Sequence, residues 1–183
     1  GAAASYNNHL GVPLTLARMP PDAALAVLEI GMNHRGEIAP LSRLARPHVA
    51  VITTIAPAHL EALGSMEAIA EEKSDIMAGL EPGGTAVLPA GLPQTPILLA
   101  AARAAGARIV TFDATGEAAA DWRWRDLVLS ADTAAGGVDS PAGPLLVRLA
   151  APGRHMAANA LAALAAATAA GADPALAALD LGQ

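Results

Sequence analysis

The chain has 183 residues, of which 54% are hydrophobic and 15% are charged. This length suits one domain with a buried core, and the composition is far from that of a disordered segment. The formal net charge of −6 argues against binding to the phosphate backbone of nucleic acids. The absence of cysteine excludes disulfides, thiolate metal sites and cysteine nucleophiles. No uncharged apolar stretch is long enough to insert into a membrane.

The first half of the chain predicts alternating strands and helices. Two continuous apolar runs, residues 24–30 (ALAVLEI) and 49–55 (VAVITTI), are typical of strands covered on both faces in a parallel sheet. Residues 37–45 lie between them and have helical spacing, so the three segments predict one βαβ unit. A helix that starts after Ser65 is expected to continue to the turn at residues 81–84.

The second half continues this alternation and then changes. A strand at 85–88, a helix at 95–105 and a strand at 107–112 are expected. Residues 122–130 and 145–149 then predict antiparallel strands on either side of the turn-rich segment 136–144. Two helices, 156–170 and 173–183, complete the pattern. The predicted fold class is α/β, with a three-layer, mainly parallel sheet flanked by helices and an antiparallel edge extension.

Polar residues follow the predicted strands, at the sheet edge where open α/β sheets bind ligands. Glu29 is near the end of the first strand, where burying a carboxylate is costly unless it is paired or bound to a cation. Hydrogen bonding to nearby backbone amides is the alternative for Glu29. His59 follows the second strand, although a lone loop histidine is most often only a surface residue. Together, the carboxylate and the imidazole predict a site for magnesium or manganese.

Lys73 is the only lysine of the chain, whose other basic residues are arginines. A solvated helix face with weak ion pairs is the simpler interpretation of Lys73 among its acidic neighbours. A lysine amine, unlike a guanidinium, can lose its proton and react covalently. A helix starts after residues 153–155 and presents Asn159 one turn later, which fits either a nucleotide contact or a plain polar helix entry. Residues 6–13 predict a polar turn.

Two common catalytic motifs are missing from the sequence. The chain contains no G-x-x-x-x-G-K-[ST] loop, the usual cradle for a nucleoside triphosphate. It also contains no G-x-S-x-G motif, which argues against a common serine hydrolase.

Five segments of the sequence, taken in order, resemble the central ATPase domain of the Mur ligases, and most closely the D-alanyl-D-alanine-adding members. They are residues 7–15 (NNHLGVPLT), 28–38 (LEIGMNHRGEI), 58–65, Lys73 and 153–163. The resemblance implies a cytoplasmic bacterial enzyme of peptidoglycan synthesis. In such an enzyme, ATP phosphorylates the terminal carboxylate of UDP-N-acetylmuramoyl tripeptide. The amine of D-Ala-D-Ala then attacks the acyl phosphate, and Mg²⁺ screens the phosphate charges.

The resemblance also implies a role for each matching residue. Glu29 would hold one magnesium ion, and His59 would hold a second together with a carbamylated Lys73; these three are the expected catalytic residues. The expected adenine contacts are Asn159 and His155, and the expected contacts with the muramoyl peptide are Asn7, Asn8, Asn33 and His34.

The family has a phosphate-binding loop a few tens of residues before the position of Asn7, but here only six residues precede it. We therefore expect residues 1–183 to be a partial central domain, without the phosphate-binding loop, the N-terminal UDP-binding domain and the C-terminal domain. The expected fragment is monomeric and inactive by itself. A folate-type or poly-amino-acid ligase of the same family is the enzymatic alternative, and an interaction module on the same fold is the non-catalytic one.

Overall fold

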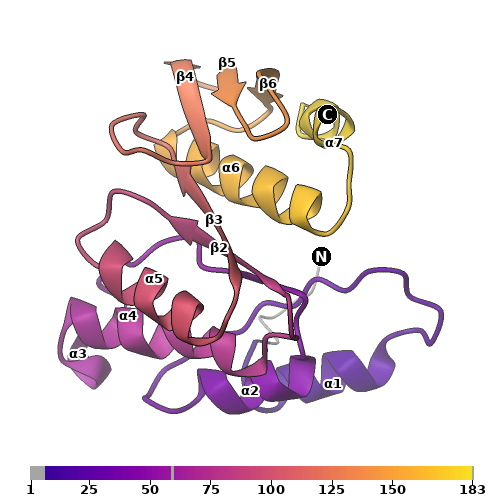
Figure 1. Cartoon of the computed structure of the whole chain (residues 1–183), viewed down its shortest axis with the longest axis vertical. Coiled ribbons are helices and arrows are strands. Elements are labelled where there is room, and N and C mark those ends of the chain that lie inside the picture. Colours follow the sequence, from indigo (N-terminus) through magenta and orange to yellow (C-terminus); the bar gives the residue numbers. More distant parts are fainter. Residues whose placement is uncertain (1–6, 59, 183) are drawn as a thin grey trace.

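The computed structural model describes residues 7–58 and 60–182, which form one mixed sheet with helices on both faces (Figure 1). The order in the sheet is β1-β2-β3-β4-β5-β6. Strands β1 to β4 pair in parallel, and β4, β5 and β6 pair antiparallel, which confirms the predicted fold class. The strands are β1 (Val49–Val51), β2 (Thr85–Pro89), β3 (Arg108–Asp113), β4 (Trp122–Leu129), β5 (Ala134–Asp139) and β6 (Leu145–Leu149).

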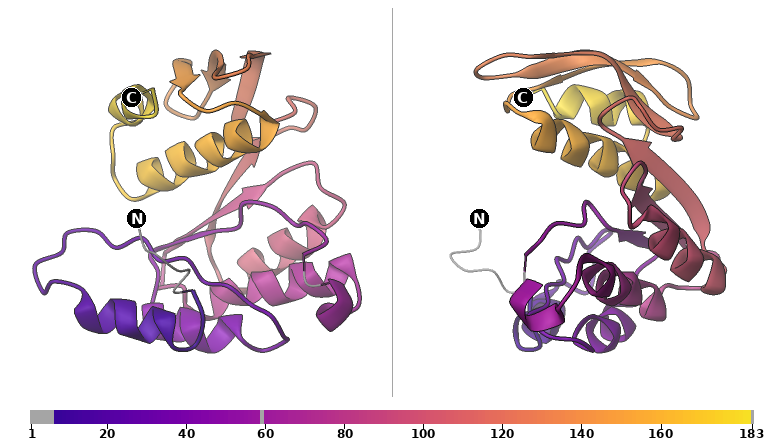
Figure 2. Two further views of the ribbon diagram at one scale, coloured as in Figure 1. Left: turned by 180° about the vertical axis from the view of Figure 1, so that it is seen from behind. Right: turned by 90° about the vertical axis from the view of Figure 1, so that its left-hand side faces the viewer.

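Two groups of helices cover the two faces of the sheet (Figure 2). Helix α6 packs against β1 to β4, and α7 packs against α6 and β6. On the opposite face, α5 packs against β2 and β3, α4 packs against α5, and α2 packs against η1. No helix in the described part of the chain is long and apolar enough to cross a membrane. The helices are α1 (Gly11–Arg18), α2 (Ile38–Ala45), α3 (Leu60–Leu63), α4 (Met66–Ser74), η1 (Asp75–Gly79, 3-10), α5 (Thr95–Ala104), α6 (Arg154–Ala169) and α7 (Pro174–Asp180).

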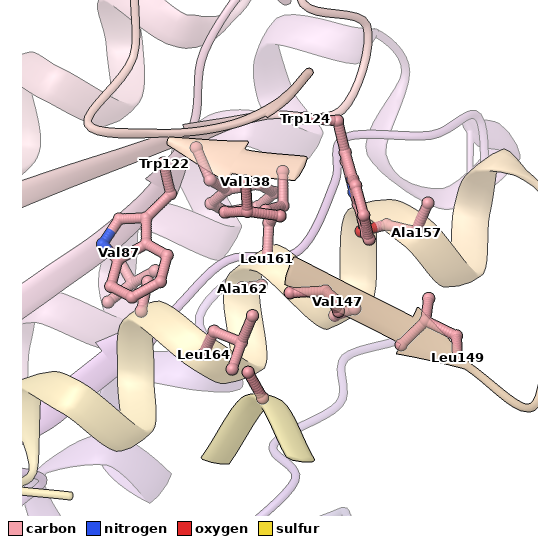
Figure 3. Packing of buried hydrophobic residues seen from close by; sticks show 14 of the residues in the cluster. Val87, Trp122, Trp124, Val138, Val147, Leu149, Ala157, Leu161, Ala162 and Leu164 are labelled. Atoms are coloured by element: carbon pink, nitrogen blue, oxygen red, sulfur yellow. The ribbon is translucent and has the colours of Figure 1, made fainter. Parts of the chain in front are cut away.

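Strand β2 is buried along its whole length and separates two hydrophobic cores. Its alternating side chains divide between them: Val87 joins the core under α6, whereas Ala86 and Leu88 join the core under α4 and α5. Figure 3 shows the α6 core, where Trp122 and Trp124 of β4 pack near the helix. The Trp124 indole N–H donates to the carbonyl of Ala157 (2.9 Å), which ties β4 to α6.

The prediction of a strand at residues 24–30 is wrong. The segment is not a strand, and Leu25 and Val27 are 70% and 89% exposed. A strand needs hydrogen-bonded neighbours, and an apolar run does not supply them. In the described part of the chain, β1 lies at the edge of the sheet and pairs with β2 alone. The predicted βαβ unit therefore fails at its first strand, although α2 and β1 are present.

The prediction of a turn-rich connection at residues 136–144 is wrong in part, because β5 (Ala134–Asp139) lies between β4 and β6. Its Gly136 and Gly137 suggested a turn, but Gly136 lies opposite an irregularity between Arg125 and Val128, where the register of β4 shifts. A side chain at Gly136 would meet the Arg125 carbonyl at 3.0 Å. The glycine thus allows two backbones to approach closely, as glycine often does at a bulge.

The predicted polar turn at residues 6–13 is also wrong in part, because α1 begins at Gly11. The Asn8 side-chain oxygen accepts hydrogen bonds from the backbone N–H groups of Leu10 (3.0 Å) and Gly11 (2.9 Å). These bonds satisfy N–H groups that the start of a helix leaves without partners. Helix α1 then packs against α2.

Gly79 allows α2 and η1 to pack backbone to backbone. A methyl group at Gly79 would overlap the carbonyl group of Ser42 in α2. We expect Gly79→Ala to lower the free energy of unfolding by about 1–3 kcal/mol, because the two elements must move apart. In the matched control, Gly137→Ala, the new methyl meets first the flexible side chain of Arg125, and we expect a loss below about 1 kcal/mol. Urea unfolding of both variants checks this, and equal losses would contradict it.

Candidate functional site

Lys73 lies in α4 and points toward the segment that follows β1. Helix α4 begins after Ser65, as predicted, and the Ser65 hydroxyl oxygen accepts from the Ala68 backbone N–H (3.1 Å) as an N-cap. The Lys73 ammonium donates to the carbonyl of Thr54 (2.8 Å). Burial lowers the pKa of Lys73, because the charged form loses contact with water. Lys73 is therefore a partly desolvated amine near the carboxyl end of a parallel strand, not a member of a solvated helix face.

Glu29 is exposed and is held by the side chain of Asn7. The Asn7 amide nitrogen donates to a Glu29 carboxylate oxygen (2.8 Å), and the Gly31 backbone N–H donates to the Asn7 carbonyl (2.8 Å). A side chain at Gly31 would collide with the Asn7 amide, at 2.6 Å from its nitrogen. The prediction that the Glu29 carboxylate is buried is therefore wrong. Its partner is a side-chain amide 22 residues earlier, which fixes where the carboxylate points.

The turn that carries Asn33 and His34 is organised by Glu37. The Glu37 carboxylate accepts from the backbone N–H groups of Asn33 (2.6 Å) and His34 (3.2 Å) and contacts the His34 ring nitrogen Nδ1 (3.2 Å). The two backbone hydrogen bonds, first from Asn33 and then from His34, lower the pKa of Glu37 because they favour its ionised form. Asn33 and His34 are exposed, so their side chains face solvent from a turn whose backbone is fixed.

Glu72 is a site residue that the sequence reasoning missed. Its buried carboxylate accepts from the backbone N–H groups of Gly36 (2.7 Å), Glu37 (2.9 Å) and Ile38 (3.1 Å) at the start of α2. The acidic run around Lys73 suggested a solvated face. Helical spacing could have indicated that Glu72 is buried, because Ile69, Glu72 and Ile76 lie three and four residues apart and share one helix face.

The predicted adenine contacts lie in the first turns of α6. Gly153 precedes the helix with φ of 98°, a conformation that suits glycine. The His155 ring folds back over it, so that a side chain at Gly153 would come within 3.0 Å of Cε1. His155 and Asn159 are four residues apart, which places both on one face of α6, and both are exposed.

The structure brings some of the predicted residues together and leaves others separate. Asn7 joins Glu29, and Glu72 joins the turn with Asn33 and His34 to the helix of Lys73. His155 and Asn159 belong to α6, on the opposite face of the sheet from α4. His59 lies outside the described residues, so its assignment stays a prediction. Among the residues that are described, no three His, Cys, Asp or Glu side chains cluster as a metal site.

Comparison with known proteins identifies the family. The model of the Mur ligase middle domain matches residues 1–167. The chain belongs to the Mur ligase middle-domain family. A relative in Escherichia coli, UDP-N-acetylmuramoyl-tripeptide--D-alanyl-D-alanine ligase, is 37% identical over 163 residues, which cover 89% of this chain and 35% of the relative. The ligase of the same name from Bacillus subtilis is 51% identical over 83 residues, or 45% of this chain and 18% of that one.

A solved structure extends this likeness to the fold of the middle domain. A crystal structure of MurF from Acinetobacter baumannii superposes with a TM-score of 0.92 at 34% sequence identity. The superposition covers 98% of this chain and 38% of that protein. The chain thus spans about a third of the length of the E. coli relative and of this MurF.

The lowered pKa of Glu37 makes the stability of this middle domain depend on pH. Because the hydrogen bonds depress the pKa in the folded state, their contribution is present above the unfolded value of 4.5 and is lost as the pH falls through the folded value. We expect Glu37→Gln to melt below the wild type at pH 7, and the gap to narrow progressively below pH 4.5. Thermal melts between pH 3 and pH 7 check this, and a gap independent of pH would contradict it.

Proposed function

We propose that this middle domain is the ATP-binding domain of a MurF-type ligase. The full-length protein would join D-Ala-D-Ala to UDP-N-acetylmuramoyl tripeptide through an acyl phosphate, in peptidoglycan synthesis. The names of the E. coli and B. subtilis relatives support this substrate pair. Because the chain spans about a third of the E. coli relative, we assign turnover to the full-length ligase and expect this chain alone, a partial central domain, to be inactive.

The observation that carries the proposal is the link between Lys73 and the turn at residues 33–37. The partly desolvated amine and the turn are connected through Glu72, a direct neighbour of Lys73 in α4. An acyl transfer between two large substrates requires that binding groups and reacting groups keep a fixed geometry. In this assignment, Asn33 and His34 contact the muramoyl peptide together with Asn7 and Asn8.

Two of the proposed ligands, Glu29 and a carbamylated Lys73, are oxygen donors of the kind that magnesium prefers. Glu29 offers a carboxylate whose orientation Asn7 fixes, and Asn7 therefore supports Glu29 in addition to its expected substrate contact. Lys73 becomes an oxygen ligand if its neutral amine adds CO2, which forms an N–C bond and releases one proton. His59 completes the proposed ligand set of Glu29, His59 and Lys73. Magnesium, when bound, would screen the negative charge of the phosphate groups.

The nucleotide is assigned to the start of α6, where Asn159 and His155 would contact the adenine. Both side chains are exposed on one face of the helix, so a planar base can reach them. A UDP-linked substrate and ATP are both cytoplasmic metabolites, and we assign the ligase to the bacterial cytoplasm as a monomer.

A substrate panel with the full-length ligase tests the proposed function. We expect Mg-ATP-dependent release of phosphate with UDP-N-acetylmuramoyl tripeptide and D-Ala-D-Ala together, and none when either is omitted. Turnover of a folate and glutamate, but not of the muramoyl substrate, would identify a folate-type ligase instead. Binding of a protein partner without turnover of any substrate would identify an interaction module.

The single lysine of the chain allows a direct test of the carbamate. We expect the chain in 13C-labelled bicarbonate to show a carbamate carbon signal from Lys73, because burial favours its neutral amine. The Lys73→Arg variant retains the N-terminal amine and serves as the control, since a guanidinium forms no carbamate under these conditions. A carbamate signal of equal strength in both proteins, or no signal in either, would contradict the assignment.

A further inference from the structure

Glu72 is a buried carboxylate of α4 that accepts hydrogen bonds from the start of α2. It is 5% exposed and accepts three hydrogen bonds from consecutive backbone N–H groups, those of Gly36, Glu37 and Ile38. Burying an ionised carboxylate is costly, and hydrogen bonds from N–H groups offset that cost. The start of a helix is favourable for a negative charge, since its N–H groups lack partners within the helix. Glu72 therefore joins α4 to the first residues of α2.

A second carboxylate carries the connection from Glu72 to the exposed turn. The backbone N–H of Glu37 donates to Glu72, while the side chain of Glu37 accepts from the backbone N–H groups of Asn33 and His34. The turn is thus fixed to α4 through two successive carboxylates. The next residue after Glu72 is Lys73, whose ammonium is held by Thr54. One rigid unit therefore contains the amine of Lys73 and the turn that presents Asn33 and His34.

Packing alone does not account for a glutamate at this position. Ile69 on the same face of α4 is fully buried, so the environment accommodates an apolar side chain there. Replacing buried charges by apolar residues is often neutral or stabilising in proteins. An apolar residue, however, would leave the N–H groups of Gly36, Glu37 and Ile38 without this acceptor. Among the described residues, the turn would then keep only the exposed ion pair of Arg35 with Glu71 (3.5 Å) as a polar side-chain contact with α4.

We propose that Glu72 is a positioning residue for the muramoyl-peptide substrate. It acts through the backbone at residues 36–38 and through Glu37, and it sets the distance between the turn at Asn33 and His34 and the amine of Lys73. This inference rests on the proposed function, because that function supplies the substrate that the turn would bind. Glu72 touches no reacting atom and serves binding and alignment.

The test uses the full-length ligase and the variant Glu72→Gln. The amide keeps one acceptor oxygen but turns an N–H donor group toward backbone donors, so at least one of the three hydrogen bonds is lost. We expect the KM for UDP-N-acetylmuramoyl tripeptide to rise about tenfold, in line with loss of a charged hydrogen bond. The KM for ATP should stay within about twofold, since α6 lies outside the unit.

The matched control is Glu71→Gln, which changes the residue of α4 next to Glu72. It removes an exposed ion pair between Glu71 and Arg35 (3.5 Å). Exposed pairs contribute little, so we expect wild-type KM values for all substrates. Glu37→Gln is the second variant, and it should reproduce the rise in the KM for the tripeptide even if Glu72→Gln fails to fold. A rise confined to the tripeptide supports the proposal. Unchanged KM values, or an equal rise for every substrate, would overturn it.

Hydrogen exchange provides a readout that does not depend on turnover. In Glu72→Gln, the amides of residues 36–38 should exchange about tenfold faster than in the wild type, while those of β2 keep the wild-type rate. Unchanged exchange at residues 36–38 would overturn the proposal. A wild-type ligase without activity on the muramoyl substrate would overturn the proposed function and the substrate named here, while exchange would still decide whether Glu72 fixes the turn.

Discussion

The two-sided burial of the parallel strands is the constraint on which the rest of the structure depends. Strand β2 has no exposed residue, so each face must be covered by helices, and its alternating side chains enter two different cores. Parallel strands also end at one common edge of the sheet. Residues that follow these ends, such as Thr54 after β1, are brought beside helices of the same face. The position of Lys73 follows from this arrangement.

At the candidate site, carboxylates and backbone amides connect segments that are far apart in the sequence. Glu72 reaches the start of α2 across 34 to 36 residues, and Asn7 reaches Glu29 across 22. Such contacts fix exposed residues without burying them. The turn at Asn33 and His34 therefore stays exposed while its backbone keeps a defined shape.

Much of the fold could be predicted from the sequence, because it depends on local signals. The Ser65 cap, the apolar run of β2 and the glycine before α6 each act within a few residues. The errors arose where structure depends on distant partners. Residues 24–30 are apolar enough for a strand but have no strand paired with them in the described part of the chain. Gly136 was interpreted as part of a turn, whereas in the structure it allows two strands to approach closely.

The site was predicted in part for the same reason. The sequence placed Lys73 on a helix after the second apolar run, and the single lysine drew attention to it. Glu72 escaped notice because acidic residues on a helix are usually solvated, and its three backbone donors belong to a different helix. The support that Asn7 gives to Glu29 was equally hidden, because no spacing rule connects residues 7 and 29.

The most direct test locates the divalent cation that we propose beside Lys73. The 15N-labelled chain, in bicarbonate buffer, would be titrated with small amounts of Mn²⁺, which broadens the NMR signals of nearby amides. We predict that broadening appears first at the amides of Glu29, Gly31 and Thr54. Broadening centred on the acidic residues of β4 and β5, such as Asp126 and Asp139, or spread evenly over the surface, would contradict a cation site beside Lys73.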